Sequence, residues 1–212
     1  MGYNSLYNLY LKRWLGFVLA LLALPIALPF YLIIALCIVI DNGFPVFYRP
    51  LRGGYNNKPF HIFKFRTMVK NADKIGGGTT ALNDPRITRV GAFLRKTKLD
   101  ETPQLLNILI GNMSFIGPRP ELLRYVEKYH DEELLILKVR PGITDFSSVE
   151  FINLDEVVGS DNADEAYEKY VLKRKNELRI KYATCVSFGV DCKLFFGTIW
   201  RVIQKIIRTI TK

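Results

Sequence analysis

The longest feature of the hydrophobic pattern is an apolar segment near the start of the chain. From Trp14 to Ile40, 27 residues pass without a charged side chain. A straight helix of that length would extend roughly 40 Å, more than the ~30 Å hydrocarbon core of a bilayer. The segment is longer than the apolar part of a signal peptide, and no small-residue cleavage site follows it. The pattern therefore predicts a membrane helix.

The path of this helix is left open by the pattern. Pro25 and Pro29 each remove a backbone hydrogen bond, and lipid offers no replacement partner, so we expect a break near Pro25. Lys12 and Arg13 precede the segment, and a basic stretch follows it. Positively charged flanks stay on the cytoplasmic side. A re-entrant helix that leaves by the face it entered and a helix that spans the bilayer are both compatible with these features.

The remaining pattern predicts short strands followed by helices. Residues 44–48 and 60–67 are rich in aromatic side chains and are separated by glycines and asparagines, which predicts a small β-hairpin. Asp84 followed by Pro85 is typical of a helix start, and Gly111 of a helix end. The expected helices cover 84–96, 101–110, 121–138 and 163–182, with an extended segment at 143–149 and an acidic loop at 152–163.

The C-terminal stretch 191–212 has the pattern of an amphipathic helix. Basic residues recur at helical spacing beside an apolar face with Trp200 near its edge; the basic residues are Arg201, Lys205, Arg208 and Lys212, and the apolar residues are Ile199, Ile203, Ile206 and Ile210. Such a helix suits a membrane surface. A helix packed on the domain core has the same pattern, so both interpretations stay open.

Composition narrows the possible partners and chemistry. The 212 residues suffice for one domain with a core, and 30 Lys and Arg against 20 Asp and Glu give a net charge of +10, which favours anionic partners. Three cysteines without a Cys-x-x-Cys motif argue against a disulfide framework. Two histidines, far apart in sequence, argue against a His/Cys metal site or a Ser-His-Asp triad. Carboxylates are therefore the better catalytic candidates.

Asp100 and Glu101 form a pair of acids behind a basic run. Asp100 is a good N-cap and Glu101 suits the first turn of a helix, so the pair is explained by capping alone. However, Pro103 would occupy the position whose N–H normally binds the cap, which leaves a carboxylate oxygen available. Arg119 lies between two prolines downstream. Carboxylates beside an anion site call for a divalent ion such as Mg²⁺, and a carboxylate can then act as nucleophile.

Three motifs carry a resemblance to a known family. They are YRPLRGGYNNKPFHIFKFRTM at 48–68, DPRITRVGAFLRKTKLDETPQLLNILIGNMSFIGPRPE at 84–121 and RPGIT at 140–144. With the apolar N-terminus and its proline, they make the chain resemble the bacterial sugar transferase family, the small monotopic phosphoglycosyl transferases. The resemblance covers nearly the whole chain. It implies an α+β, mostly helical fold with a re-entrant membrane helix over 1–42, broken at Pro25, and a cytosol-facing catalytic domain over 43–212 with interfacial amphipathic helices.

The resemblance also implies an activity. Such enzymes transfer a phospho-sugar from a nucleoside diphosphate sugar, usually a UDP-sugar, to polyprenol phosphate at the cytoplasmic face of the bacterial inner membrane. They release UMP and begin glycan assembly. By analogy Asp100 is the nucleophile that forms a covalent intermediate, Glu101 helps to hold Mg²⁺, and Arg119 and Arg95 contact phosphate. Residues 145–151 depart from the family's usual Gly-Trp/Leu-Ala-Gln-Val-Asn-Gly.

A second hypothesis belongs to a different class. A membrane-tethered, non-catalytic binding or scaffold protein could use its basic face on lipids, with Asp100 and Glu101 serving only as helix-capping residues. Nucleic acid is not an expected partner, because aromatic residues interleaved with base-reading basic motifs are absent from the sequence.

Overall fold

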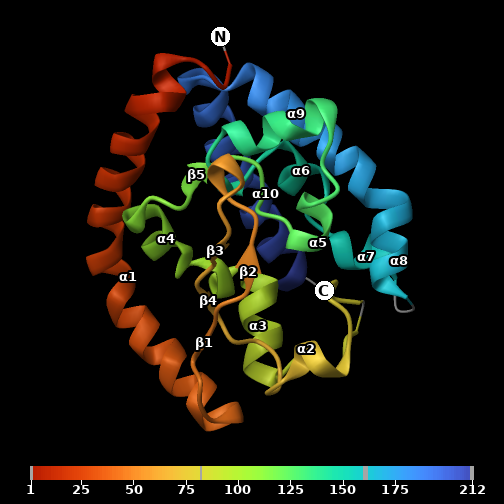
Figure 1. The fold of residues 1–212 in the computed structure, drawn as a ribbon. Coiled ribbons are helices and arrows are strands. Elements are labelled where there is room, and N and C mark those ends of the chain that lie inside the picture. Colours follow the sequence, from red (N-terminus) through yellow and green to blue (C-terminus); the bar gives the residue numbers. More distant parts are fainter. Residues whose placement is uncertain (1, 82, 160–161, 211–212) are drawn as a thin grey trace.

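Helices account for most of the fold, and its strands are short. The computed structural model describes residues 2–81, 83–159 and 162–210. Within these residues the strands form three two-stranded sheets. Figure 1 shows the long N-terminal helix along one side of the molecule and the hairpin strands between it and the C-terminal helices. The expected class, mostly helical with small sheets, is confirmed.

The N-terminal apolar segment is one long helix. A π-helical turn, η1 (Tyr7–Leu11), leads into α1 (Lys12–Asn42), and the combined helix is long and apolar enough to cross a membrane. The expected break at Pro25 does not interrupt it, because helical backbone continues through Pro25 and Pro29. A proline removes one backbone hydrogen bond and bends a helix without having to end it. Figure 1 accordingly shows α1 as a curved rod.

Both ends of α1 contact the rest of the protein. Near its start, Lys12 Nζ lies 2.9 Å from Asp191 Oδ2. At its end, Arg66 donates a 2.9 Å hydrogen bond to the Asn42 carbonyl. The inner face of α1 therefore follows the folded domain along its length. Its outer face is apolar and exposed, and includes Trp14, Val18, Leu22, Ile26, Phe30, Ile33 and Ile40.

The predicted hairpin is confirmed, with two separate ladders. Strand β1 (Phe47–Tyr48) pairs antiparallel with β4 (Lys64–Phe65), and β2 (Leu51–Arg52) pairs antiparallel with β3 (Phe60–His61). The 3-10 turn η2 (Tyr55–Asn57) joins the two inner strands. This hairpin brings Arg52 and Lys64 to the cavity described below.

The helix expected from Asp84 starts later. After the short α2 (Ala72–Ile75) and the exposed glycine loop 76–78, α3 runs over Arg89–Thr97, and its N-cap is Thr88, whose hydroxyl accepts a 3.0 Å bond from Gly91 N. The Asp84 carboxylate is not a cap, because it accepts from the Arg86 side chain at 2.6 Å. A Cβ at Gly91 would lie 2.0 Å from the Thr67 carbonyl oxygen, so only glycine allows α3 to approach the hairpin this closely.

The expected helix 101–110 divides into two pieces. A 3-10 turn, η3 (Leu99–Glu101), precedes α4 (Gln104–Ile110). The end is as expected, because Gly111 takes a left-handed conformation with φ of 100° after the last turn. The start differs from the expectation of Asp100 as N-cap. Pro103 is the N-cap of α4, and its side chain makes no capping hydrogen bond.

The segment after α4 differs from the sequence prediction in two places. In place of one helix over 121–138 there are α5 (Leu123–Val126) and a 3-10 helix, η4 (Asp131–Lys138). The extended segment is limited to β6 (Gly142–Thr144), which pairs in parallel with β5 (Ser114–Ile116). It then turns into α6 (Phe146–Glu150), because the Asp145 carboxylate caps that helix through the Ser148 amide at 2.7 Å. The Gly-Pro-Arg-Pro and Pro-Gly-Ile-Thr motifs thus lie side by side.

The C-terminal third is helical. The stretch expected as an acidic loop contains α7 (Leu154–Val158), and the charged helix consists of α8 (Ala163–Ala166), η5 (Tyr167–Leu172) and α9 (Lys173–Cys185). Helix α10 (Phe188–Ile210) follows.

Helix α10 packs partly on the core, and its contact with a membrane stays a prediction. Leu194 is buried in the core, whereas Phe196, Ile199, Trp200 and Ile203 are exposed. Lys212, which belongs to the predicted basic series, lies outside the described residues, as do the side chains of Lys205, Ile206, Arg208 and Ile210.

Candidate active site

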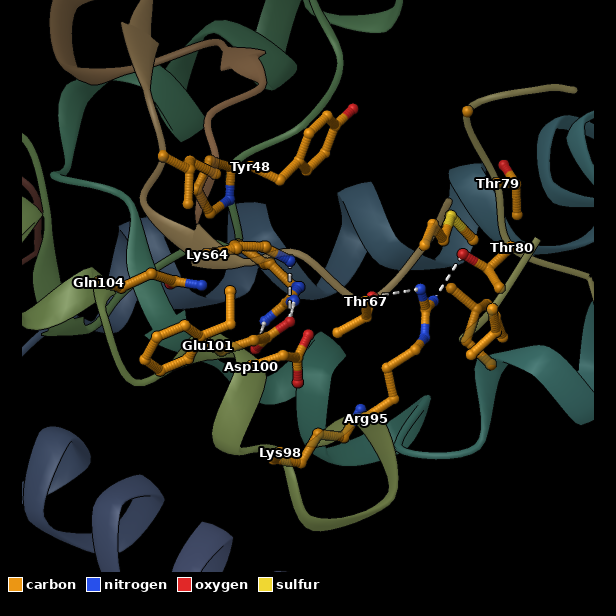
Figure 2. Close-up of a pocket in the computed structure, with 18 of the residues that line it drawn as sticks. Tyr48, Lys64, Thr67, Thr79, Thr80, Arg95, Lys98, Asp100, Glu101 and Gln104 are labelled. Atoms are coloured by element: carbon orange, nitrogen blue, oxygen red, sulfur yellow. Dashed lines mark hydrogen bonds and ion pairs between the residues drawn. The ribbon is translucent and has the colours of Figure 1, made fainter. Parts of the chain in front are cut away.

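A large open cavity lies at the centre of the molecule. Its volume is about 1590 Å³, and it is lined by the hairpin, α3, η3, the loop after β5, α9 and α10. Figure 2 shows Asp100 and Glu101 in this cavity, with Lys64 and Gln104 on one side and Arg95 on the other. The sequence motifs of the hairpin, of α3 and η3, and of the proline-flanked arginine therefore meet at one place.

Asp100 is a buried carboxylate whose Oδ1 oxygen has no hydrogen-bond partner among the described residues. The residue is 8% exposed, and no described group donates to its buried Oδ1 oxygen. It caps neither η3 nor α4, since η3 begins after Lys98 and α4 after Pro103. The expectation of an N-cap at Asp100 is thus wrong; a carboxylate oxygen is free there, but not for the expected reason, because Pro103 is itself the N-cap of α4. An unpartnered buried carboxylate is costly, which makes it a candidate for chemistry.

Glu101 has two cationic partners. Both nitrogens at the end of the Arg119 guanidinium donate to its carboxylate, Nη1 at 2.9 Å, and Lys64 Nζ donates to Oε1 at 3.0 Å. Burial acts to raise the pKa of Glu101, but the charges of Arg119 and Lys64 outweigh it and hold the pKa well below its usual range. Glu101 is therefore a fixed negative charge at neutral pH.

The pKa of Asp100 is shifted in the opposite direction. Burial is the main cause that raises it, and the negative charge of Glu101 adds to this effect, while Lys64 and Arg95 oppose it. Two adjacent carboxylates with pKa values moved apart are characteristic of catalytic sites. Of the pair, Asp100 is the one with an oxygen available to a ligand.

Arg119 is positioned by its backbone and by Glu101. Prolines on both sides restrict the chain, and the Arg119 amide donates a 3.4 Å bond to Asp145 Oδ2. The guanidinium also donates to the Ile143 carbonyl at 3.1 Å. Arg119 lines the cavity as expected, but its guanidinium is bound to the Glu101 carboxylate.

Arg95 approaches from α3 on the other side of Asp100. Its Nη2 donates to Thr80 Oγ1 at 2.6 Å, and its Nη1 donates to Thr67 Oγ1 at 3.4 Å (Figure 2). No described carboxylate forms an ion pair with it. Asp100, Glu101, Arg119 and Arg95 thus converge on one cavity. Pro25 lies in α1 and does not line it.

Sequence reasoning missed several residues of the cavity. The sequence places Lys64 within a family motif but gives no sign of its role. In the structure Lys64 is partly buried, next to the buried Phe65 in β4. Glu121 and Arg179 form a second buried ion pair with an N–O distance of 2.9 Å, and Tyr167 also donates to Glu121. Lys175 lies beside them. No spacing rule connects these residues, because they come from three distant segments.

Comparison with known proteins decides the family. The sequence profile described as "Bacterial sugar transferase" matches residues 7–205. The chain belongs to the bacterial sugar transferase family. The matched range includes α1, the hairpin, the Asp100–Glu101 pair and most of α10, so every part of the site described above lies within the family region.

Individual relatives in the bacterial sugar transferase family extend over most of the chain. The UDP-glucose:undecaprenyl-phosphate glucose-1-phosphate transferase of Escherichia coli (strain K12) is 36% identical over 92% of this chain. The exopolysaccharide production protein PSS of Rhizobium leguminosarum bv. phaseoli is 39% identical over 91% of this chain and 94% of its own length. This chain spans only 40% of the length of the Escherichia coli relative.

The carboxylate pair is compatible with Mg²⁺. No group of three or more His, Cys, Asp or Glu residues that could hold a metal occurs within the described residues. Mg²⁺ is usually held by one or two carboxylates together with phosphate oxygens and water. The unpartnered Asp100 oxygen supplies one such donor, whereas both Glu101 oxygens accept from Arg119 or Lys64, so the rest of the donor set would have to come from a bound diphosphate and water.

Proposed function

We propose that this protein transfers a sugar phosphate from a UDP-sugar to polyprenol phosphate and releases UMP. One observation carries the proposal: Asp100 offers a buried, unpartnered carboxylate oxygen in a cavity with basic walls. The relatives' names support the substrates, since the Escherichia coli protein is named for UDP-glucose and undecaprenyl phosphate. A relative from Aeromonas hydrophila is named for UDP-N-acetylgalactosamine and undecaprenyl phosphate.

The reaction is a double displacement at one phosphorus. An Asp100 carboxylate oxygen attacks the β-phosphorus of the donor, and the bond to the bridging oxygen breaks. That oxygen leaves with its electron pair on UMP, and the phospho-sugar stays on Asp100 as an acyl phosphate. A phosphate oxygen of polyprenol phosphate then attacks the same phosphorus. The bond to Asp100 breaks, the carboxylate is regenerated, and the product is a polyprenyl diphosphate sugar.

The neighbouring residues have distinct roles in this proposal. Arg95 and Arg119 stabilise negative charge on the phosphoryl oxygens, as preorganised cations do in phosphoryl transfer. Glu101 holds Arg119 and Lys64 in place through its ion pairs. When Mg²⁺ is bound, the free Asp100 oxygen would hold it together with diphosphate oxygens, Glu101 would become a ligand only by releasing Lys64 or Arg119, and the ion would neutralise charge on the diphosphate. Removal of the metal with EDTA should therefore abolish UMP release.

The proposed location is the cytoplasmic face of the bacterial inner membrane. The contacts at both ends of α1 support a re-entrant helix, because a helix that crossed the bilayer would place its ends on opposite sides of it. Both flanks are also basic, as expected for cytoplasmic ends. Within this arrangement residues 1–42 form the membrane element and residues 43–212 the catalytic domain.

A direct assay tests the proposed function. Purified full-length protein is incubated with undecaprenyl phosphate, Mg²⁺ and a panel of UDP-sugars, and UMP is measured. We expect UMP with at least one donor from the wild type and none from Asp100→Asn. Equal UMP release from both proteins would reject Asp100 as the nucleophile. Absence of release with every donor would reject the activity.

The scaffold hypothesis loses its main support. It requires Asp100 and Glu101 to act as capping residues, yet neither side chain caps a helix. Glu101 is instead bound to Arg119 and Lys64, and Asp100 has an unpartnered oxygen.

A further inference from the structure

Arg52 and Lys175 face the central cavity, and neither has an ion-pair partner among the described residues. Arg52 lies in the hairpin strand β2 and Lys175 in the first turn of α9, and both line the cavity. Neither forms a salt bridge within the described part of the chain. Arg52 donates to the carbonyl of its neighbour Leu51 at 3.0 Å, and Lys175 makes one long bond, 3.5 Å, to Tyr167 Oη.

Lys175 is buried although its hydrogen-bonding capacity is largely unused. The residue is 6% exposed, and its ammonium lies 4.9 Å from the centre of the Tyr167 ring and 5.9 Å from that of Phe151. Aromatic faces attract a cation, but they do not replace hydrogen bonds for its three N–H groups. A buried ammonium with one weak partner on a cavity wall is suited to an acceptor that enters from the cavity.

The surrounding carboxylates are already occupied. Glu121 accepts from Arg179 at 2.9 Å and from Tyr167, and Glu101 accepts from Arg119. Glu121 links the two cations: the backbone N–H of Gly53, next to Arg52, donates to the Glu121 carbonyl at 3.0 Å, and Lys175 donates to Tyr167 Oη, which in turn donates to the Glu121 carboxylate. Burial lowers the pKa of Arg52, and it lowers that of Lys175 to about 7, with Arg179 adding to the effect on Lys175. The region has more cations than carboxylates, which is the condition for binding an anion.

We propose that Arg52 and Lys175 form a second phosphate subsite, which binds the phosphate that leaves with the nucleotide and then the phosphate of the polyprenol acceptor. This inference rests on the proposed function. In an in-line displacement the leaving oxygen lies opposite the Asp100 nucleophile. In the second step the attacking acceptor oxygen must approach opposite the Asp100 leaving group. The UMP phosphate and the acceptor phosphate therefore use the same position in turn, and one pair of cations serves both.

Paired binding measurements on the full-length protein test this subsite without turnover. Calorimetry gives the Kd of UMP and of uridine, which lacks the phosphate, and their ratio measures the contribution of the phosphate. We expect Lys175→Met and Arg52→Met each to weaken UMP binding at least tenfold while the Kd of uridine stays unchanged. Lys173→Met removes a charge from an exposed position on the same helix and should bind both ligands as the wild type does.

Kinetics extend the test to the acceptor. If the wild-type protein turns over, the same two variants should raise the KM for undecaprenyl phosphate by a factor similar to their loss of UMP affinity. Lys175→Arg should keep the KM close to the wild-type value.

Several outcomes would overturn the subsite. Equal weakening of UMP and uridine binding would show that the pair recognises the nucleoside or maintains the fold. Unchanged UMP affinity in both variants, with or without a lower Tm, would show that neither residue binds phosphate. If wild-type protein releases no UMP from any UDP-sugar while the UMP-to-uridine ratio falls as expected, the subsite stands and the proposed function fails.

Discussion

Asp100 and Glu101 are neighbours in the chain, but their carboxylates have different partners. Glu101 is neutralised by Arg119 and Lys64, whereas a buried oxygen of Asp100 has no partner. Only Asp100 can therefore offer an oxygen to phosphorus without first breaking an ion pair. The sequence argument for a free oxygen assumed that Asp100 caps a helix with Pro103 at its third position, and this premise is wrong because Pro103 is itself the N-cap of α4. The ion pairs of Glu101 could not be predicted, because Lys64 and Arg119 reach it through tertiary packing.

Asp100→Asn should stop UMP release but should not destabilise the protein at neutral pH. Because the folded-state pKa of Asp100 is raised, its ionised form costs stability above that pKa, and the cost disappears as the pH falls below the ordinary range of an aspartate. We expect the variant to gain about 1 kcal/mol at pH 7, the order expected for a buried unsatisfied group. The gain should shrink toward pH 4.

Thermal unfolding at several pH values measures this difference. If Asp100 were a helix cap, its replacement would instead lower the free energy of unfolding by about 1 kcal/mol. A lower Tm for Asp100→Asn at pH 7 would thus restore the capping interpretation of the pair.

Glu101→Gln should be strongly destabilising. It leaves Arg119 and Lys64 without their carboxylate in a site where the Glu101 side chain is 12% exposed, and breaking such a pair costs about 3 kcal/mol. Since the pKa of Glu101 is lowered, its contribution is present above the usual range of a glutamate and is lost only as the pH falls through the lowered value.

Thermal unfolding at pH 7 checks this prediction against Glu150→Gln. Glu150 pairs with Arg174 on the exposed surface, so its replacement should change Tm little. Equal shifts in the two variants would mean that the Glu101 ion pairs contribute no more than surface pairs.

At the scale of elements, local sequence signals predicted types better than boundaries. The apolar segment, the hairpin, the helix end at Gly111 and the charged helix near the C-terminus are all present. Two of the boundary errors share a cause, which is competition for polar side chains. The Asp84 carboxylate binds Arg86 and so cannot cap a helix, while Asp145 caps α6 and ends the extended segment. These partners depend on which polar group lies nearest after folding.

Helix α1 should have both ends on the cytoplasmic side of the membrane. In a background that lacks Cys37, Cys185 and Cys192, a single cysteine replaces either Asn4, which precedes the helix in sequence, or Lys58, which follows it. We expect a membrane-impermeant maleimide to label neither position in intact spheroplasts and both after permeabilisation, because both ends of α1 contact one domain.

Labelling of exactly one of the two positions in intact spheroplasts would show that the helix spans the bilayer. An engineered cysteine in a periplasmic protein should be labelled before permeabilisation and confirms that the reagent reaches the outer face.

At the scale of the whole molecule, the cavity extends from helix α10, part of the proposed membrane surface, to Asp100, the proposed nucleophile. The net charge of +10 favours an anionic surface, with roughly 1 kcal/mol for each basic residue close to it. Helix α10 lines the cavity through Thr198 and Val202 and exposes Phe196 and Trp200. The sequence indicated a membrane protein with an anionic ligand. It could not indicate the cavity, which is made from segments that extend from Pro45 to Val202.

Phe196→Ala combined with Trp200→Ala should impair turnover mainly in lipid. Loss of two exposed aromatic anchors weakens the seating of α10 on a bilayer. In anionic liposomes that contain undecaprenyl phosphate we expect roughly a tenfold lower rate, since about 1.4 kcal/mol of lost interaction corresponds to that factor. In detergent with a short-chain polyprenol phosphate the rate should match the wild type. An equal loss in both media would mean that these residues support the fold instead.

Identification of the modified residue tests the central claim most directly. Wild-type protein is mixed with a UDP-sugar that supports turnover, without acceptor, then quenched, digested and analysed by mass spectrometry. The account predicts up to one equivalent of UMP per enzyme and a sugar-phosphate adduct on Asp100 that disappears when polyprenol phosphate is added. An adduct on another residue, or UMP release that requires the acceptor and leaves no adduct, would contradict it.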